Sequence, residues 1–383
     1  MRAFALPLRT PLATGHGPIA SRSGFLVCLE DEMGRVGFGE ATPLAEFGTE
    51  DLSHCQAAVA RALGVLADGV ARDFDQALAA SGIAAGAQAP CARAALDTAL
   101  HDLEAKQAGR ALADRIRARA GLLGEPAKRV RVQALISGQS PRAVASNARA
   151  SVAAGFDAVK LKLAVSAVHR DLGIDLERVT ALREAVGPER RIRLDANEAW
   201  DGDEAQVALE ALEPFGIDFI EQPVVRTDLA SLARLDAAGS IAVAADEALL
   251  GEGLEACLTA RAASVFVLKP SAIGGISASL AAARRAREAS VRIVWSNLIE
   301  GLPGRAAALS LAAGLDEGEE VHGLGTASLL LADLAISKPG ETGSGEAGVV
   351  EIGSRSGLGC ELVATWRATG GVFGEGAVFE GRT

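Results

Sequence analysis

The chain has 383 residues, of which 49% are hydrophobic, and its 49 acidic side chains against 38 basic ones give a net charge of −11. This length exceeds one ordinary globular core, so we expect two domains, or a barrel with a second layer. The acidic balance offers no basic face for a nucleic acid. No apolar run reaches the roughly 18 residues of a membrane-spanning helix, so we expect no membrane partner.

The N-terminal residues and the cysteines indicate the cellular compartment in which the protein is expected. Pro7 interrupts the first apolar stretch too early for a secretory signal peptide, which makes the cytoplasm the expected location. The cysteines are scattered, odd in number and without C-x-x-C spacing. We therefore expect neither a disulfide framework nor a zinc site, and treat them as small core residues.

Residues 1–125 predict an α+β domain. Residues 24–40 contain two apolar runs around a polar turn, which is the pattern of a β-hairpin. The flanking segments 14–22 and 43–50 are rich in glycine, proline and polar residues, and they predict loops. Over residues 53–118 the apolar residues recur at three- and four-residue steps, which predicts helices.

Residues 126–339 show another pattern, in which short apolar strands alternate with helices. Strand starts are expected near residues 130, 157, 191, 217, 241, 264, 291 and 321. This repeat of βα units favours a closed parallel barrel over an open doubly wound sheet. The open sheet would place a glycine-rich phosphate loop after its first strand, and residues 137–140 lack the G-x-G-x-x-G pattern. Beyond residue 340 the alternation stops, and we expect residues 340–383 to complete the first domain.

The stretch from Val159 to Leu163 reads apolar, Lys, apolar, Lys, apolar. Because side chains alternate across a strand, Lys160 and Lys162 should point to one face while the apolar residues face the opposite layer. Burying an ammonium group is costly unless it is paired or neutralised. Two of them on one face predict an anionic site nearby.

Three later strands each end in a carboxylate, namely Asp195, Glu221 and Asp246. A parallel barrel brings the carboxyl ends of its strands to one rim, so these acids should converge there. Close carboxylates require a cation, and hard oxygen ligands select Mg²⁺, with Mn²⁺ as a substitute. One such acid alone is better explained as a helix N-cap or a surface group, but three in register favour a metal site.

Lys269 follows the sixth barrel strand and lies opposite Lys162, on the second, by strand order. A lysine at a strand end commonly buries only its stem. With a metal between two opposed lysines, however, the pattern predicts proton abstraction from a small-molecule carboxylate, with the metal stabilising an enediolate. The base must be neutral, so we expect the metal and Lys160 to lower the pKa of Lys162.

Together these motifs resemble the enolase superfamily, in the branch that includes muconate-lactonising enzymes, dipeptide epimerases, N-acylamino-acid racemases and o-succinylbenzoate synthases. The matching segments are Lys160-Leu161-Lys162, Asp195-Ala196-Asn197, Glu221-Gln222-Pro223, Asp246-Glu247, and Lys269 followed by Gly274-Gly275. Lysine bases with Mg²⁺ are established chemistry for that superfamily. The resemblance spans nearly the whole chain and implies a modified TIM-type (β/α)7β barrel under an α+β capping domain. It also places Gly15, His16 and Arg22 in a loop that closes over the substrate.

Within this branch, residues 294–301 and 322–326 resemble o-succinylbenzoate synthases, and the Asp-x-Asp of typical dipeptide epimerases is absent at 322–326. The implied reaction is loss of water from 2-succinyl-6-hydroxy-2,4-cyclohexadiene-1-carboxylate, giving o-succinylbenzoate in menaquinone biosynthesis, which is hydro-lyase chemistry. Lys162 would remove the proton and assist departure of the hydroxyl group, and Lys269 would face the ring as a cation. The implied substrate-binding residues are Arg22, Asn197, Ser296, Asn297, Gly323, Gly325 and Thr326.

Other functions stay open. The site could act as an N-succinylamino-acid racemase, with Lys162 and Lys269 on opposite faces of the α-carbon, or as another epimerase or cycloisomerase of the superfamily. Trp295 and Asn297 are larger than a synthase would lead us to expect at the seventh strand. A non-catalytic binding barrel is disfavoured, because it would not need both lysines and all three acids. His322 is either a ligand-facing or a structural histidine, and a homo-oligomer is left open.

Overall fold

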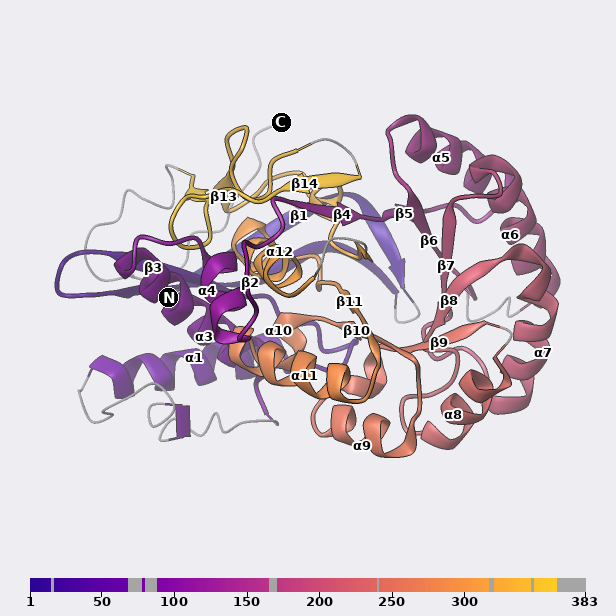
Figure 1. Ribbon diagram of the computed structural model, residues 1–383, viewed down its shortest axis with the longest axis horizontal. Helices are drawn as coiled ribbons and strands as arrows, with labels where there is room; N and C mark the ends of the chain where they lie inside the picture. Colours follow the sequence, from indigo (N-terminus) through magenta and orange to yellow (C-terminus); the bar gives the residue numbers. More distant parts are fainter. Residues whose placement is uncertain are drawn as a thin grey trace.

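A computed structural model describes residues 1–14, 17–67, 78–79, 88–164, 171–239, 241–316, 320–345 and 348–363. An antiparallel sheet with helices lies on one side of the molecule, and parallel strands surrounded by helices lie on the other (Figure 1). This is the predicted α/β architecture, a barrel with an α+β capping domain. Within the described ranges, no helix combines the length and the apolar character needed to cross a membrane.

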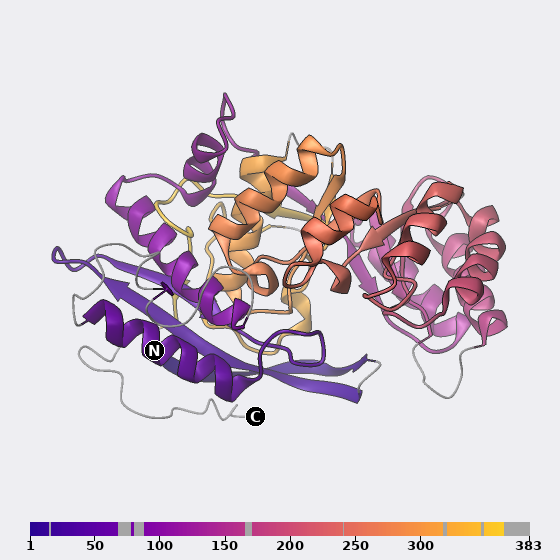
Figure 2. The same cartoon turned by 90° about the horizontal axis from the view of Figure 1, so that it is seen from below.

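The N-terminal sheet contains β1 (Arg2–Thr14), β2 (Gly17–Glu30) and β3 (Val36–Ala41), in that order. Helices α1 (Leu52–Ala67), α3 (Pro90–Gln107) and α4 (Leu112–Arg119) follow, and α3 lies against the sheet (Figure 2). Glycines of β3 permit this contact, because a Cβ on Gly37 or Gly39 would lie 2.0 or 1.8 Å from a carbonyl oxygen of α3.

The predicted hairpin at residues 24–40 is present as β2 and β3, which pair antiparallel. The predicted loop at residues 14–22 is wrong for most of its length. β1 and β2 continue to pair as far as Thr14 and Gly17, so backbone hydrogen bonding overrides the local glycine and proline content. Residues 15 and 16 lie outside the described part of the chain.

The barrel strands pair in parallel from β5 to β11 in chain order. The ring closes because Ser296, just after β11, pairs with Gly323, and β12 pairs with β4, which leads directly into β5. A strand begins within one residue of each predicted start, and β5, for which no separate start was predicted, follows β4 after Gln133. The strands are β4 (Arg129–Val132), β5 (Ala134–Ile136), β6 (Ala158–Lys162), β7 (Arg191–Asp195), β8 (Ile217–Glu221), β9 (Ala242–Ala245), β10 (Val265–Leu268), β11 (Arg292–Trp295) and β12 (Val321–His322).

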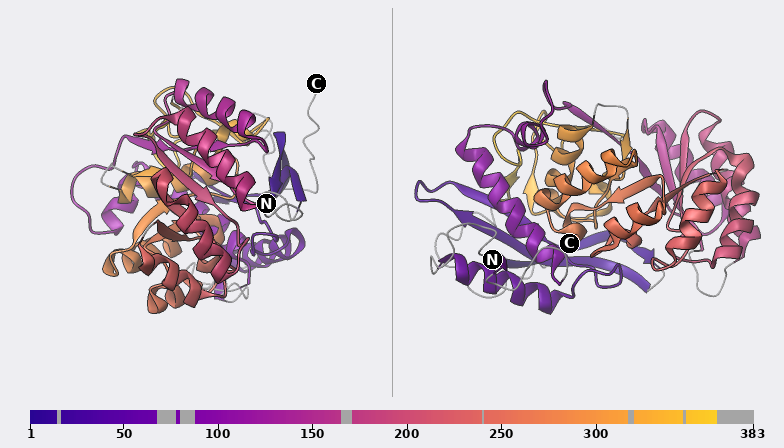
Figure 3. Two further views of the ribbon diagram at one scale, coloured as in Figure 1. Left: turned by 90° about the vertical axis from the view of Figure 1, so that its right-hand side faces the viewer. Right: turned by 60° about the horizontal axis from the view of Figure 1, so that its bottom comes forward.

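Helices lie outside these strands, as Figures 1 and 3 show from two sides. They are α5 (Pro141–Ala153), α6 (Leu172–Val186), α7 (Gly202–Leu212), α8 (Leu229–Ala238), α9 (Gly253–Ala260), α10 (Pro270–Ile273), α11 (Ile276–Glu288) and α12 (Leu302–Leu315). Asp171, Asp201 and Asp228 cap α6, α7 and α8 by accepting backbone N–H bonds. These helices are therefore capped by residues other than the acids at the strand ends.

Two buried acids of the N-terminal domain fix it to the barrel. Glu40 accepts hydrogen bonds from the backbone N–H groups of Gly301, at 2.6 Å, and Gly304, at 3.0 Å, at the start of α12. Asp97 accepts one from Ser277 at 2.9 Å, at the start of α11. Because these donors are the unsatisfied N–H groups of helix starts, the two domains dock through capping interactions.

The C-terminal segment includes β13 (Ala335–Ile336), β14 (Val349–Glu351) and β15 (Glu361–Leu362). β14 pairs antiparallel with β4 of the barrel. The Leu358 N–H donates to Asp102 of α3 at 2.7 Å, so the segment also contacts the first domain. The domain division into 1–125 with 340–383, and 126–339, stays a prediction.

Candidate active site

One cavity of about 140 Å³ lies where the carboxyl ends of the barrel strands face the first hairpin. Apolar side chains of the N-terminal domain form its roof, and charged side chains at the strand ends form its floor. Every predicted site residue except Arg22 lines it: Lys160, Lys162, Asp195, Asn197, Glu221, Asp246, Lys269, Ser296, Asn297, Gly323, Gly325 and Thr326. The barrel topology has therefore brought these residues together as expected from the sequence.

The two lysines of β6 share one face, as strand alternation predicts. Lys160 and Lys162 line the cavity, while Val159 and Leu161 are fully buried in the layer between strands and helices. Lys162 lies beside Asp195 in the register of β6 and β7. The amines of β6 are thus directed at the acids of the neighbouring strands.

Lys160 joins two of the three acids. Its ammonium nitrogen lies 2.8 Å from Asp195 Oδ2 and 2.7 Å from Glu221 Oε1. Burial opposes ionisation of Asp195, but the charges of Lys160 and Lys162 outweigh it and lower the Asp195 pKa. Burial raises the pKa of Glu221 to about 8, against the opposing charge of Lys160. Burial therefore disfavours the charged form of Glu221 more than the charge of Lys160 favours it.

Lys269 holds the third acid. Its ammonium group donates to both carboxylate oxygens of Asp246, and it lies 4.2 Å from the centre of the Phe47 ring. Burial would lower the pKa of Lys269, but the attraction of Asp246 in particular outweighs it and raises that pKa. Asp246 begins a short 3-10 helix, Glu247–Leu249, yet its side chain makes no capping hydrogen bond there. The simpler explanation of this acid as an N-cap is therefore wrong.

The donor set fits a hard divalent cation. Asp195, Glu221 and Asp246 are buried, with side chains at most 3% exposed, and all face one cavity. Among the described residues no group of three or more His, Cys, Asp and Glu side chains is already arranged around a metal position. Lys160 and Lys269 pair with the carboxylate oxygens of these acids. The fit to a divalent cation therefore rests on the chemistry of the three converging carboxylates, which are the oxygen ligands that Mg²⁺ prefers.

Several residues that line the cavity were not predicted from the sequence. Leu12, Ile19, Leu44 and Phe47 of the N-terminal domain cover the cavity. Gln133 and Leu135, on either side of the start of β5, also line it. Gln133 could have been found by extending the strand-end argument to the first barrel strand. The roof residues carried no signal, because isolated apolar side chains near turns are common in any protein.

The far wall is polar but uncharged. Asn297 Nδ2 donates to Thr326 Oγ1 at 2.9 Å, and Ser296 lies beside Gly323. A Cβ on Gly325 would lie 2.5 Å from the backbone oxygen of Gln133, so close packing of the backbone requires this glycine. A Cβ on Gly323 would instead meet the side-chain oxygen of Ser296 at 2.8 Å.

The prediction that Arg22 belongs to a closing loop is wrong. Arg22 lies in β2, is 3% exposed, and donates to the carbonyl oxygens of Thr42, Pro43 and Leu298. Its guanidinium is occupied in joining the N-terminal sheet to the segment after β11, and it does not line the cavity. Gly15 and His16 fall outside the described residues.

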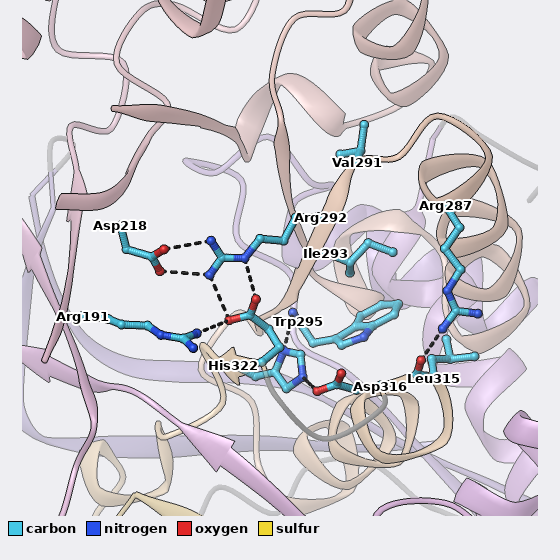
Figure 4. Close-up of a pocket in the computed structure, with 11 residues that line it drawn as sticks. Arg191, Asp218, Arg287, Val291, Arg292, Ile293, Trp295, Leu315, Asp316 and His322 are labelled. Carbon is cyan, nitrogen blue, oxygen red and sulfur yellow. Dashed lines mark hydrogen bonds and ion pairs between the residues drawn. The ribbon is translucent and has the colours of Figure 1, made fainter. Parts of the chain in front are cut away.

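His322 faces the opposite end of the barrel. Its Nδ1 accepts a hydrogen bond from the Trp295 N–H at 3.1 Å, and its Nε2 lies 3.2 Å from Asp316 Oδ2 (Figure 4). The cavity there measures about 650 Å³. Several of its charged residues pair with one another, as Arg292 does with Asp218 at 2.8 Å, while Arg287 donates to the Leu315 carbonyl oxygen. His322 is thus a structural histidine. The paired charges at this end of the barrel serve its stability.

Comparisons with known proteins agree with this geometry. Residues 143–366 match the model of the family described as enolase C-terminal domain-like, and residues 1–94 match the model described as MenC, N-terminal domain. The chain belongs to the enolase superfamily. Solved structures of the muconate-lactonising branch of that superfamily share its fold.

Relatives in the superfamily have several activities. An o-succinylbenzoate synthase from Thermobifida fusca (strain YX) is 30% identical over 334 residues, covering 87% of this chain and 82% of that protein. The chloromuconate cycloisomerase CbnB of Cupriavidus necator is 33% identical over 227 residues, 58% of each chain. A crystal structure of a dipeptide epimerase from Enterococcus faecalis V583, complexed with Mg and the dipeptide L-Leu-L-Tyr, superimposes with a TM-score of 0.79. It is 26% identical and covers 94% of this chain and 98% of that one. These relatives are enzymes of different reaction classes.

Proposed function

We propose that this superfamily member is an o-succinylbenzoate synthase. The reaction would be dehydration of 2-succinyl-6-hydroxy-2,4-cyclohexadiene-1-carboxylate, a hydro-lyase step of menaquinone biosynthesis, in the cytoplasm. The similarity to the synthase from Thermobifida fusca extends over 87% of the chain and supports this choice. The charge distribution of the cavity supports it independently.

The observation that carries the proposal is the uncharged far wall. Among the residues that the structure describes, the acids that line the cavity are Asp195, Glu221 and Asp246, all on its floor. The amine of a dipeptide would therefore have no carboxylate partner away from the floor, and burying an unpaired ammonium is costly. The proposed substrate instead carries a second carboxylate, at the end of its succinyl arm. That carboxylate could accept hydrogen bonds from the Asn297 amide and the Thr326 hydroxyl group, so an uncharged wall with these donors suits it better than it suits an ammonium group.

The floor residues divide the chemistry. Lys162, as a neutral amine, would take the proton next to the substrate carboxylate. The resulting ammonium would return a proton to the departing hydroxyl group, so that one water leaves and the ring becomes aromatic. Lys269 would remain a cation on the other side, where its attraction to the ring grows as the ring aromatises. Lys160 would stay charged between Asp195 and Glu221 and keep the floor neutral.

A divalent cation completes the floor in this proposal. Asp195, Glu221 and Asp246 would hold Mg²⁺, with Mn²⁺ as a substitute, and the bound ion supplies a Lewis acid for the substrate carboxylate. The buried acids then need less positive charge from the lysines. This would leave the amine of Lys162 available as a base.

The test is a direct assay. Purified protein with Mg²⁺ should consume the cyclohexadiene substrate, followed by loss of its diene absorbance, and excess EDTA should stop the reaction. Lys162→Ala, shown to be folded by circular dichroism, should be inactive. A folded, metal-loaded wild-type protein with no turnover would sink the proposal.

N-succinylamino-acid racemisation is the second candidate. It is favoured by the presence of two lysines in one cavity, Lys162 and Lys269, each on a different strand. With N-succinyl amino acids and Mg²⁺ in D₂O, a racemase would incorporate deuterium at the α-carbon. The same experiment with L-Leu-L-Tyr separates this candidate from a dipeptide epimerase, the activity of the relative from Enterococcus faecalis V583.

A further inference from the structure

The roof residue Phe47 is held by the barrel through a single arginine. Phe47 belongs to the turn at residues 45–48 of the N-terminal domain, and its ring covers the Lys269 ammonium at 4.2 Å. Its backbone oxygen accepts a hydrogen bond from Arg226 Nη1 at 2.9 Å. Arg226 comes from the loop between β8 and α8 of the barrel.

Glu198 fixes the guanidinium of Arg226. Its Oε1 accepts from the backbone N–H and from Nε of Arg226, at 2.6 and 3.0 Å, and its Oε2 accepts from Nη2 at 2.7 Å. Donation of hydrogen bonds to the Glu198 carboxylate raises the pKa of Arg226. A forked ion pair of this kind has a defined geometry as well as charge attraction. Nη1 is therefore aimed at the Phe47 carbonyl rather than free to rotate.

At both ends of this connection the backbone has a positive φ, and at the turn the arginine packs closely against it. Glu198 has φ +62° and follows Asn197 at φ +46°, and its own N–H donates to the Gln222 oxygen at 2.8 Å. On the other side, Gly48 has φ +113°, and a Cβ there would lie 2.4 Å from Arg226 Nη1. The strained backbone after β7 and the glycine in the turn each allow the arginine to approach Phe47.

We propose that Arg226 is a positioning residue that latches the 45–48 turn onto the barrel, so that the Phe47 ring stays over Lys269. Glu198 orients the latch. Arg226 does not line the cavity, and its effect on the reacting groups passes through Phe47. The inference uses the proposed role of Lys269 only for its kinetic consequence, and its structural part holds whichever superfamily reaction the protein performs.

The structural test is amide hydrogen exchange on the full chain. The N–H groups of Phe47 and Gly48 bond to Leu44 and Ala45 at 3.0 and 2.9 Å within the turn, so they report its opening. Arg226→Ala removes the charged donor that bonds to the Phe47 carbonyl oxygen. Amide exchange over residues 44–50 should therefore become about tenfold faster or more. Exchange in β10 should not change.

Arg234 provides a matched control. It lies on α8, donates to the Gly202 carbonyl oxygen at 2.9 Å, and contacts nothing in the N-terminal domain that the structure records. Arg234→Ala should leave exchange over residues 44–50 at the wild-type rate. Arg226→Lys, which keeps the charge and most of the stem, covers the case in which Arg226→Ala does not fold, and it should also accelerate exchange there because lysine lacks the fork.

Kinetics separate positioning from simple stability. With whichever substrate proves active, the folded Arg226 variants should raise KM about tenfold, with a smaller effect on kcat, because the roof closes less often. Wild-type exchange in both Arg226 variants, or equal acceleration in Arg234→Ala, would overturn the latch. Faster exchange in a protein without synthase activity would support the latch and count against the proposed function alone.

Discussion

The ammonium nitrogen of Lys160 lies 2.7 and 2.8 Å from the two carboxylate oxygens of Glu221. Burial would lower the pKa of Lys160, but the charges of Asp195, Glu221 and Asp246 outweigh it and raise the pKa. These contacts favour the charged form of Lys160, which makes it a poor candidate for the base. Of the two lysines on β6, Lys162 is therefore the one to which the proposed function gives the proton transfer, although both face the same cavity.

Removing the Lys160 charge should make stability depend on the metal. Lys160→Ala leaves Asp195 and Glu221 buried without their shared cation, which should lower the free energy of unfolding by about 3 kcal/mol without metal. A divalent ion on the same oxygens should restore much of that loss. Urea unfolding of wild type and variant, with and without Mg²⁺, measures the difference.

The control for this experiment is an exposed lysine. Lys128→Ala removes a pair with Glu125 in which both side chains are more than four-fifths exposed, at 84% and 81%. Its stability should match wild type under both conditions. If Lys160→Ala loses the same stability with and without Mg²⁺, the metal does not bind these carboxylates.

The two candidate reactions make different demands on Lys269. In the dehydration, Lys162→Ala should lower kcat by about 10²–10⁴, the usual contribution of a general base. Lys269→Met should cost only about tenfold, because it removes an attraction to the ring and no proton transfer. Racemisation uses both lysines as acid and base, so the two variants should be equally impaired. Steady-state kinetics with both substrates decide, and equal losses with the cyclohexadiene would contradict the proposed roles.

Glu40 should make stability fall as pH rises. Burial, followed by the charge of Glu300, raises the pKa of Glu40 to about 7 in the folded protein from 4.5. Between these pH values the folded state binds more protons than the unfolded state, so the free energy of unfolding decreases with increasing pH. The total contribution is about 3 kcal/mol.

The effect is isolated with Glu40→Gln, which cannot titrate. The difference in unfolding free energy between wild type and variant should shrink by about 3 kcal/mol from pH 4.5 to pH 8. Loss of a hydrogen bond to Gly301 or Gly304 shifts the variant equally at every pH. Urea unfolding with Mg²⁺ present measures the curve, and Glu125→Gln, an exposed carboxylate, should run parallel to wild type. If the unfolding free energies of wild type and Glu40→Gln run parallel across this pH range, the pKa of Glu40 is not raised in the folded protein.

The floor of the site could be read from the sequence because it depends on regular geometry. Repeated βα units fix where strands end, and parallel pairing places Asp195, Glu221 and Asp246 side by side. Strand alternation then selects Lys160 and Lys162. Each step uses only local pattern and the closure of the barrel.

The roof could not be read in the same way. Phe47 reaches Lys269 because the N-terminal domain docks on the barrel, through contacts such as Glu40 with Gly301, 261 residues apart in the chain. Docking of this kind leaves no periodic pattern. It also explains the failure for Arg22, which the resemblance to the superfamily placed in a closing loop. Its guanidinium instead donates to three carbonyl oxygens at the junction of the N-terminal sheet with the segment after β11.

The two glycines of the far wall should respond differently to the same substitution. In Gly325→Ala the new Cβ would meet the Gln133 backbone oxygen at 2.5 Å, and backbone cannot easily yield, so stability should fall by about 1–3 kcal/mol. In Gly323→Ala the new Cβ meets Ser296 Oγ at 2.8 Å. That hydroxyl can rotate into the cavity, which should lower kcat/KM about tenfold while stability changes little. Adding Ser296→Gly removes the obstructing atoms and should restore kcat/KM in the double variant. Thermal unfolding and steady-state kinetics on the three variants test this, and failure of Ser296→Gly to rescue Gly323→Ala would show that the far wall does not limit the substrate.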